Sequence, residues 1–269
     1  MKLSVRQSKS PLGFSTEGGG AWKEWDRFIT FEGKKAYHIG NICGTCPFFF
    51  ELHSGTNQSL SPRSLQHELT HGIAKLTAAH VKTLEELLPN GEYDFSLRRM
   101  TPRLIAPGMH DDYFVREQPA LWGEDGKFGP HDPKTDYYRG PDQQIGDGER
   151  LFEFIIPMFP RACLKQDRVT EFEDLLACGE CPTALAISVL DVKQPADWKG
   201  DPDVNCHWSL AHYLIDGHHK VFAASLAGRP ISFISMLATE KGISGAEHHA
   251  KLKNQEVEQV SGGKGGQRR

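Results

Sequence analysis

The chain has 269 residues, a formal net charge of −4 and 38% hydrophobic residues. This length permits one large domain or two small ones, with a substantial core in either case. The near balance of 31 Lys and Arg against 35 Asp and Glu argues against general nucleic-acid binding, which needs a basic surface. No apolar run reaches the length of a membrane span, and the first residues lack the apolar segment of a secretory signal. We therefore expect a cytoplasmic protein that does not enter the membrane.

Both ends of the chain are rich in small and charged residues. We expect residues 1–20 to form a flexible arm and residues 246–269 a flexible tail. Between them, the first part (21–150) begins with a predicted strand at 36–42 and a helix at 62–88, which shows one apolar face. Residues 102–147 are rich in Gly, Pro and Asp, and their composition predicts a long loop.

The second part (151–245) has the stronger strand signals. Apolar runs predict strands at 152–158, 184–192, 210–215 and 230–238, with helices at 169–177 and 219–227. Strands and helices mix without regular alternation, so we expect an α+β fold with a mixed sheet and packed helices. The two parts can equally form one continuous globular domain, 21–245.

The segment from Asp216 to Lys220 carries the clearest functional signal. An apolar strand ends in Asp216 and Gly217, and His218, His219 and Lys220 then open a helix. A helix start offers unpaired N–H groups and a positive dipole end, which suit a phosphate or carboxylate. Asp216 can orient a histidine, hold magnesium through water, or act as a base. The alternative is a tight turn with a helix cap and surface histidines.

The sequence LIDGHHKVFAA, followed by GRPISFI, resembles the signature segment of the ParB/sulfiredoxin superfamily. Relatives in that superfamily carry a strand, a D-G-x-H-R-like turn, an alanine-rich helix and a second strand. The resemblance spans roughly 35 residues. It implies a ParB/sulfiredoxin-like C-terminal part, closest in motif to nucleotide-dependent free-serine kinases.

That resemblance implies binding of a nucleotide or another phosphorylated small molecule, with ATP or another nucleotide and Mg²⁺ as cofactors. It further implies a small-molecule phosphotransferase that acts on a hydroxyl-bearing acceptor. Gly217, His218, His219 and Lys220 would bind phosphate, and Asp216, His218 and His219 would be catalytic. Lys220 stands where relatives have arginine, and the catalytic cysteine of sulfiredoxin is missing, which argues against sulfiredoxin activity. The acidic base would come from elsewhere, with Glu51, Glu117 and Glu153 as candidates.

Two CGxCP motifs place cysteines at Cys43 and Cys46 and again at Cys178 and Cys181. Four thiolates can close a structural zinc site, which would tie the two parts of the chain together. That arrangement would suit a zinc-braced, non-catalytic module that binds DNA or a partner protein. The alternatives are unrelated thiols, or a redox pair of the CGxC type.

The pentapeptide HELTH matches the H-E-x-x-H pattern of zinc metallohydrolases. On a helix His67 and His71 share a face, and Glu68 would serve as the base. The pattern has no recognisable third ligand, and an amphipathic helix with surface histidines explains it as well. Arg98, Arg99 and Arg103 flank Pro102 and are candidates for contacting an anion. The alternative for these three residues is a solvated basic turn.

Overall fold

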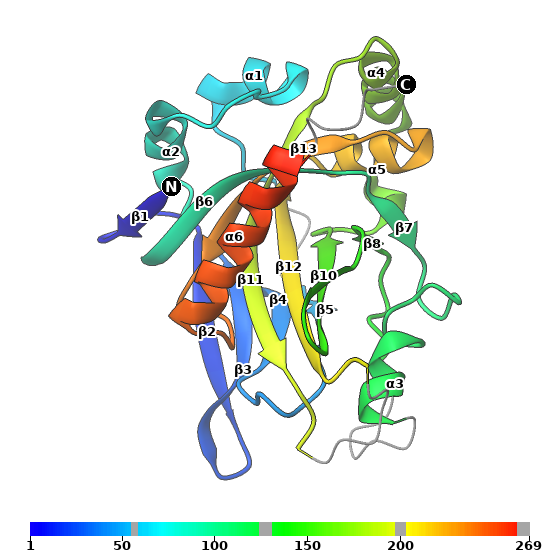
Figure 1. The fold of residues 1–269 in the computed structure, drawn as a ribbon. Coiled ribbons are helices and arrows are strands. Elements are labelled where there is room, and N and C mark those ends of the chain that lie inside the picture. The colour runs from blue at the N-terminus through cyan, green and yellow to red at the C-terminus, as the bar shows by residue number, and fades with distance from the viewer. Residues whose placement is uncertain (55–58, 124–130, 197–202, 263–269) are drawn as a thin grey trace.

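The computed structural model describes residues 1–54, 59–123, 131–196 and 203–262 (Figure 1). Two β-sheets are stacked, and helices cover the opposite face of the larger sheet. The prediction of an α+β fold with a mixed sheet is confirmed. No helix within the described ranges is long and apolar enough to cross a membrane.

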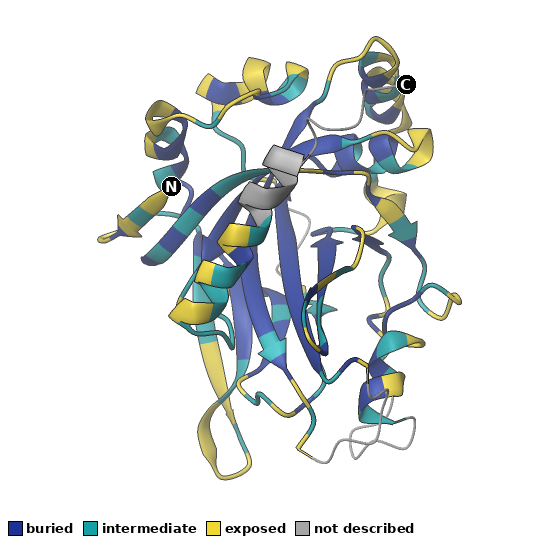
Figure 2. Cartoon of the chain, in the orientation of Figure 1, coloured by how far each residue is buried: buried dark blue, intermediate teal, exposed yellow. Residues whose placement is uncertain are grey.

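The larger sheet has nine strands. Their order is β1 (Lys2–Val5), β6 (Gly91–Met100), β13 (Ile231–Ala238), β11 (Thr183–Lys193), β12 (Cys206–Asp216), β10 (Glu149–Ile156), β8 (Tyr137–Arg139) and β7 (Arg103–Ile105), while β9 (Gln143–Gly146) pairs with β10. β10 runs parallel to β12 and β11 runs parallel to β13, and the other pairs are antiparallel. β11, β12 and β13 are buried along nearly their whole length because both faces are covered (Figure 2).

The smaller sheet has four strands, in the order β2 (Leu12–Gly19), β3 (Trp22–Phe31), β4 (Lys34–Asn41) and β5 (Glu51–Leu52). It packs through Ile29, Tyr37 and Ile39 against one face of the larger sheet. A buried ion pair joins the sheets, since Arg27 on β3 donates to both carboxylate oxygens of Asp191 on β11, at 3.0 and 2.6 Å. Such a pair fixes the relative position of the sheets through geometry more than through net stability.

Three helices cover the other face of the larger sheet. α4 (Gln166–Ala177) and α5 (His218–Ala227) pack over one end of the strands, with Phe172 and Val221 in an apolar layer. α6 (Ala246–Gly262) covers the opposite end, where Leu252 packs against Leu210 and Trp208 (Figure 1). The shorter elements are η1 (Arg63–Leu65), α1 (Gln66–His71), α2 (Ala78–Glu85), α3 (Glu117–Trp122) and η2 (Arg161–Cys163).

The larger sheet curls so that the C-terminal end of β6 reaches across towards β7, while the edge strands β1 and β7 stay on opposite sides of the molecule (Figure 1). β6 pairs with β13 near one margin and β7 pairs with β8 at the other, yet only two residues separate β6 from β7. The chain therefore crosses between margins, and the face beneath α5 and α6 is concave (Figure 1). Three polar side chains, Glu153, Ser188 and His212, line this face between the two apolar layers.

Several predicted elements match the structure closely. The predicted strands at 184–192, 210–215 and 230–238 correspond to β11, β12 and β13, and the helix at 219–227 corresponds to α5. The single helix predicted at 62–88 is wrong, because α1 ends at His71 and α2 begins at Ala78. Gly72 has φ 112°, and a Cβ there would lie 2.4 Å from the carbonyl oxygen of Cys181. The first helix therefore ends at a glycine that packs closely against the segment just before β11.

The chain ends also differ from the predictions. The expected arm forms β1 and β2, with Val5 and Leu12 buried in the core. The expected tail forms α6 up to Gly262, and the rest of it lies outside the described residues. The expected loop at 102–147 contains β7, α3, β8 and β9. Tertiary packing supplies the apolar contacts that the local composition does not indicate.

The two parts divided at residue 150 share one sheet. β6 from the first part pairs with β13 from the second over eight residues. The first part also supplies β7, β8 and β9 to the same sheet, and the expected arm supplies β1. The larger sheet therefore continues across the boundary expected at residue 150.

Candidate functional site: a cleft on the concave face

A cleft of about 930 Å³ opens on the concave face beside the crossing from β6 to β7. Its wall includes residues 97–104 and 139–143, and Glu153 lies on its floor. The C-terminal end of α5 also borders it, through Ser225 and Gly228. Clefts of this volume accommodate ligands the size of a nucleotide.

Four arginines border the cleft. Arg139 is buried and donates to Glu117 at 2.8 Å. Arg98 donates from Nε to Oε1 of Glu153 at 2.7 Å and is mostly buried. Arg103 is exposed and lies 3.7 Å from a carboxylate oxygen of Asp111, a loose pair. Arg99 is exposed and has no ion pair among the described residues. Arg98, Arg99 and Arg103 are the three arginines that the sequence marked as candidates for contacting an anion, and the structure gathers them around one cavity.

A hydrogen-bonded chain runs inward from the cleft. Glu153 accepts from His212 Nε2 at 2.9 Å, and His212 Nδ1 lies 2.6 Å from the hydroxyl of Ser188. Ser188 in turn accepts from Ser235 at 2.8 Å. Burial lowers the pKa of His212 although Glu153 opposes the shift, so the ring is neutral and each group in the chain has a partner.

Glu153 stays ionised in this buried setting. Desolvation raises its pKa, but Arg98 and His212 outweigh that effect and lower the pKa to about 2. A carboxylate with so low a pKa is a poor proton acceptor at neutral pH. Ser188, His212 and Glu153 have the residue types of a hydrolytic triad, but Ser188 is fully buried, so a substrate cannot reach its hydroxyl.

The predicted phosphate corner at Asp216 to Lys220 is occupied by protein contacts. His218 Nε2 accepts from the amide of Met158 at 2.9 Å, and His219 Nε2 accepts from the amide of Lys165 at 3.0 Å. The Lys220 ammonium donates to the carbonyl of Thr183 at 2.9 Å. The three side chains thus bind three different segments instead of converging on one point.

Burial points to the same structural role for the corner. His218 and Lys220 are each 4% exposed, and the cavity beside His218 has a volume of about 10 Å³, no more than a single water needs. Desolvation lowers the pKa of Lys220, with Asp216 opposing that shift, and lowers the pKa of His218 to about 3. Asp216 accepts from Ser59 at 3.1 Å. Gly217 makes the turn at φ 95°, as the sequence predicts. We therefore correct the expected anion site at this corner to a structural junction.

The two cysteine pairs lie at opposite ends of β11. The carbonyl of Cys43 accepts from Lys193, the last residue of β11, at 2.7 Å. Cys181 lies two residues before Thr183, which begins the strand. Eleven residues of strand span about 35 Å, so Cys43 and Cys46 cannot share one ion with Cys178 and Cys181. The single four-thiolate zinc site is corrected accordingly.

In the first pair, Cys43 has a lowered pKa, which is typical of a reactive thiol. Partial burial raises the pKa of Cys43, but hydrogen bonds involving Cys46 and Thr45 outweigh that effect and lower it. Burial raises the pKa of Cys206 to about 11. In the second pair, Cys178 is exposed and the sulfur of Cys181 lies 3.3 Å from the hydroxyl of Ser232.

The HELTH segment forms α1, with the rings of His67 and His71 4.5 Å apart. Glu68, the expected base, is 3.0 Å from Nε2 of His80 on α2. Glu180 lies 3.7 Å from His71. Within the described residues, this segment does not form a cluster of three possible ligands that could hold a metal ion. The segment matches the alternative of surface histidines on a short helix.

A different cluster does bring three possible metal ligands together. His38 on β4, Glu51 on β5 and His53 just after β5 have ligand atoms within 4.8 Å of one another. Glu51 is one of the candidate bases expected from the sequence, whereas no local pattern in the sequence indicates a role for His38 or His53. Glu51 and His53 are two residues apart, which places them on one face of a strand, but the histidine opposite them becomes visible only through strand pairing.

Comparisons with known proteins give no relative. No family model matches the chain, and neither a curated protein nor a solved structure matches it.

Proposed function

We propose that the protein binds a small phosphorylated molecule in the cleft between β6–β7 and α5. The observation that carries this proposal is the gathering of Arg98, Arg99 and Arg103 around a cavity of about 930 Å³. Guanidinium groups present several donors in a plane and pair with phosphate oxygens in a bidentate manner. The concave face thus offers both the volume and the charge that a nucleotide phosphate requires.

The charges within the cleft favour an anion over a cation. The lining carries four arginines against two carboxylates, Glu153 and Asp142. Arg98 pairs with Glu153, whereas Arg99 has no ion pair within the part of the chain that the structure describes. The carbonyls at the C-terminal end of α5 would repel an anion if they were free. They accept instead from the amides of Gly228 and Arg229, which reduces that repulsion.

Binding is supported more directly than phosphoryl transfer. Transfer to a hydroxyl needs a base that reaches the acceptor, and the low pKa of Glu153 makes it a weak one. His212 cannot serve as the base either, because its two ring nitrogens form hydrogen bonds with Ser188 and Glu153. The proposal is therefore a nucleotide- or phosphate-binding protein, with phosphotransferase activity as the narrower hypothesis that a labelled-nucleotide transfer assay would test.

A ParB/sulfiredoxin-like relationship for the C-terminal part remains part of this proposal. It is supported by the element order, since β12, the turn at Gly217, α5 and β13 follow one another as the resemblance implies. In our proposal this unit provides one wall of the cleft through the end of α5, while the arginines come from β6 and β7.

The test is a thermal-shift and calorimetric screen with inorganic phosphate, ATP, ADP, CTP and GTP. A ligand at 100 times its Kd should stabilise the fold by about 2.7 kcal/mol. Removing a charge-assisted hydrogen bond costs about 1.5–3 kcal/mol, so Arg99→Ala and Arg103→Ala should each weaken binding by about 10- to 100-fold.

Arg6→Ala is the matched control, because Arg6 is exposed and pairs with Glu92 on the strand β6. It should bind as the wild type does. Lys220→Ala distinguishes the cleft from the corner at Asp216 to Lys220. Loss of binding in this variant, together with unchanged binding in Arg99→Ala, would place the ligand at the corner and overturn the proposal. Absence of binding by every phosphate compound would overturn it as well.

A further inference from the structure

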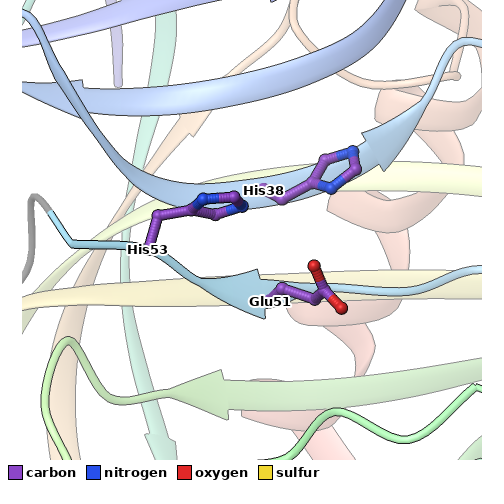
Figure 3. Close-up of side chains that lie close together, drawn as sticks. All are labelled: His38, Glu51 and His53. Atoms are coloured by element: carbon purple, nitrogen blue, oxygen red, sulfur yellow. The ribbon is translucent and has the colours of Figure 1, made fainter.

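The smaller sheet carries a second cluster of polar side chains on its outer face. His38 lies between Tyr37 and Ile39, both of which pack into the core, so its own side chain projects away from the core. Glu51 is the direct partner of His38 in the β4–β5 pair, and His53 follows two residues later on the same face. Figure 3 shows the three side chains projecting from the two neighbouring segments.

We propose that His38, Glu51 and His53 form a binding site for a divalent transition-metal ion, with Zn²⁺ as the best-suited ion. Two imidazoles and one carboxylate are the ligand set of many open zinc sites, which keep a further position for water or substrate. The set contains no thiolate, and its mixture of nitrogen and oxygen disfavours Mg²⁺ and Ca²⁺, which take oxygen ligands.

The distances are compatible with an ion after a small adjustment. The ligand atoms lie within 4.8 Å of one another. A tetrahedral ion with bonds of about 2.1 Å holds its ligands about 3.4 Å apart. Small side-chain rotations that move the ligand atoms by about 1 Å would bring them to this spacing. All three residues are half-buried.

An unpaired nitrogen supplies an independent indication of a ligand. Nε2 of His53 is buried and has no hydrogen-bond partner among the residues that the structure describes. A buried polar atom without a partner costs about 1–3 kcal/mol, and native proteins rarely leave one unsatisfied. A bound ion at the cluster would satisfy this nitrogen.

The surroundings hold the imidazole of His38 in a fixed orientation. Nε2 of His38 lies 3.1 Å from a carboxylate oxygen of Asp26, which is how an outer carboxylate orients a metal-bound histidine. Phe28 stacks on the His38 ring at 4.6 Å, and Phe49 approaches it edge-on at 4.7 Å. This aromatic enclosure limits access of water to the cluster and holds the ring in place.

The experiment uses the full chain, stripped of metal with EDTA, and titrates it with Zn²⁺ by calorimetry and with Co²⁺ by absorption. We expect one site whose cobalt spectrum shows d–d bands but lacks the near-ultraviolet thiolate charge-transfer band. His53→Gln should weaken Zn²⁺ binding by more than about 100-fold, and Asp26→Asn, which removes only the orienting group, by about 10- to 100-fold.

The matched control is the double variant His67→Gln/His71→Gln, which removes the other close histidine pair and should bind Zn²⁺ as the wild type does. Glu51→Gln, at the margin of the sheet, provides a second ligand variant if His53→Gln fails to fold. Equal affinity in the wild type and in both ligand variants, a thiolate band, or loss of binding in the control would each overturn the proposal. The metal site lies outside the arginine cleft, so either proposal can fail without the other.

Discussion

Arg98 on β6 donates to Glu153 on β10 at 2.7 Å, although three strands lie between β6 and β10 in the order of the sheet. Adjacent strands are about 4.8 Å apart, so this contact requires the sheet to curl and bring the two side chains together across its concave face. The same curl produces the cleft where a phosphorylated ligand is proposed to bind. The ion pair is therefore a marker of the tertiary arrangement on which that site depends.

Breaking this pair on one side should be strongly destabilising. Arg98→Met leaves the Glu153 carboxylate buried without its cation, and we expect a loss of about 3–5 kcal/mol in the free energy of unfolding, measured by urea denaturation. The double variant Arg98→Met/Glu153→Gln removes both charges and should lose less than the sum of the two single variants. Additive losses would show that the two groups do not interact.

Acid should destabilise the protein through His218. Its folded pKa is about 3, below the ordinary value of 6.5, because the ring is buried. Between these values the unfolded state binds more protons, so the free energy of unfolding falls as the pH drops from about 6.5 towards 3.

His218→Gln keeps an acceptor for the amide of Met158 but cannot take up this proton. Its plot of unfolding free energy against pH should be shallower by about one proton in that window. His110→Gln, at an exposed histidine, is the control and should keep the slope of the wild type. Equal slopes in wild type and His218→Gln would contradict the burial that we assign to this ring.

The two glycines that flank α5 should respond differently to substitution. Both have positive φ, 95° at Gly217 and 59° at Gly228. A Cβ at Gly217 would lie 2.6 Å from Cβ of Ala184, whereas a Cβ at Gly228 meets nothing within 4 Å. Gly228→Ala should cost only the backbone strain of about 1–2 kcal/mol, while Gly217→Ala should cost about 1–3 kcal/mol more. Melting temperatures of the two variants test this order, and equal melting temperatures would contradict the close approach of the turn to β11.

The thiol of Cys43 should react faster than the thiol of Cys206, because their surroundings shift the two pKa values in opposite directions. Hydrogen bonds involving Cys46 and Thr45 outweigh desolvation and lower its pKa, whereas burial raises that of Cys206 to about 11. At pH 7 iodoacetamide should therefore modify Cys43 well before Cys206, as followed by peptide mass mapping.

Thr45→Val removes one of the hydrogen bonds to Cys43 and should slow its alkylation several-fold. Alkylation of the exposed Cys178 in the same sample provides an internal control and should be unchanged. If Thr45→Val leaves the alkylation rate of Cys43 unchanged, the Thr45 hydroxyl does not lower the pKa of this thiol.

Local sequence determined the elements whose signals are contained in a few neighbouring residues. Continuous apolar runs specified β11, β12 and β13, because a strand covered on both faces needs no alternation. The Asp216–Gly217 pair specified the turn into α5, since glycine accepts positive φ without strain. The arginines near Pro102 were visible as a local concentration of charge.

Only the tertiary structure decided which polar groups meet. Arg98, Glu153 and His212 are far apart along the chain and come together because the sheet curls, while His38 meets Glu51 through strand pairing. The same packing commits His218, His219 and Lys220 to backbone groups of three other segments, which a pattern of neighbouring residues cannot disclose. Sequence spacing fixes the direction of a side chain along its own element, but the partner it finds depends on contacts between residues distant in the chain.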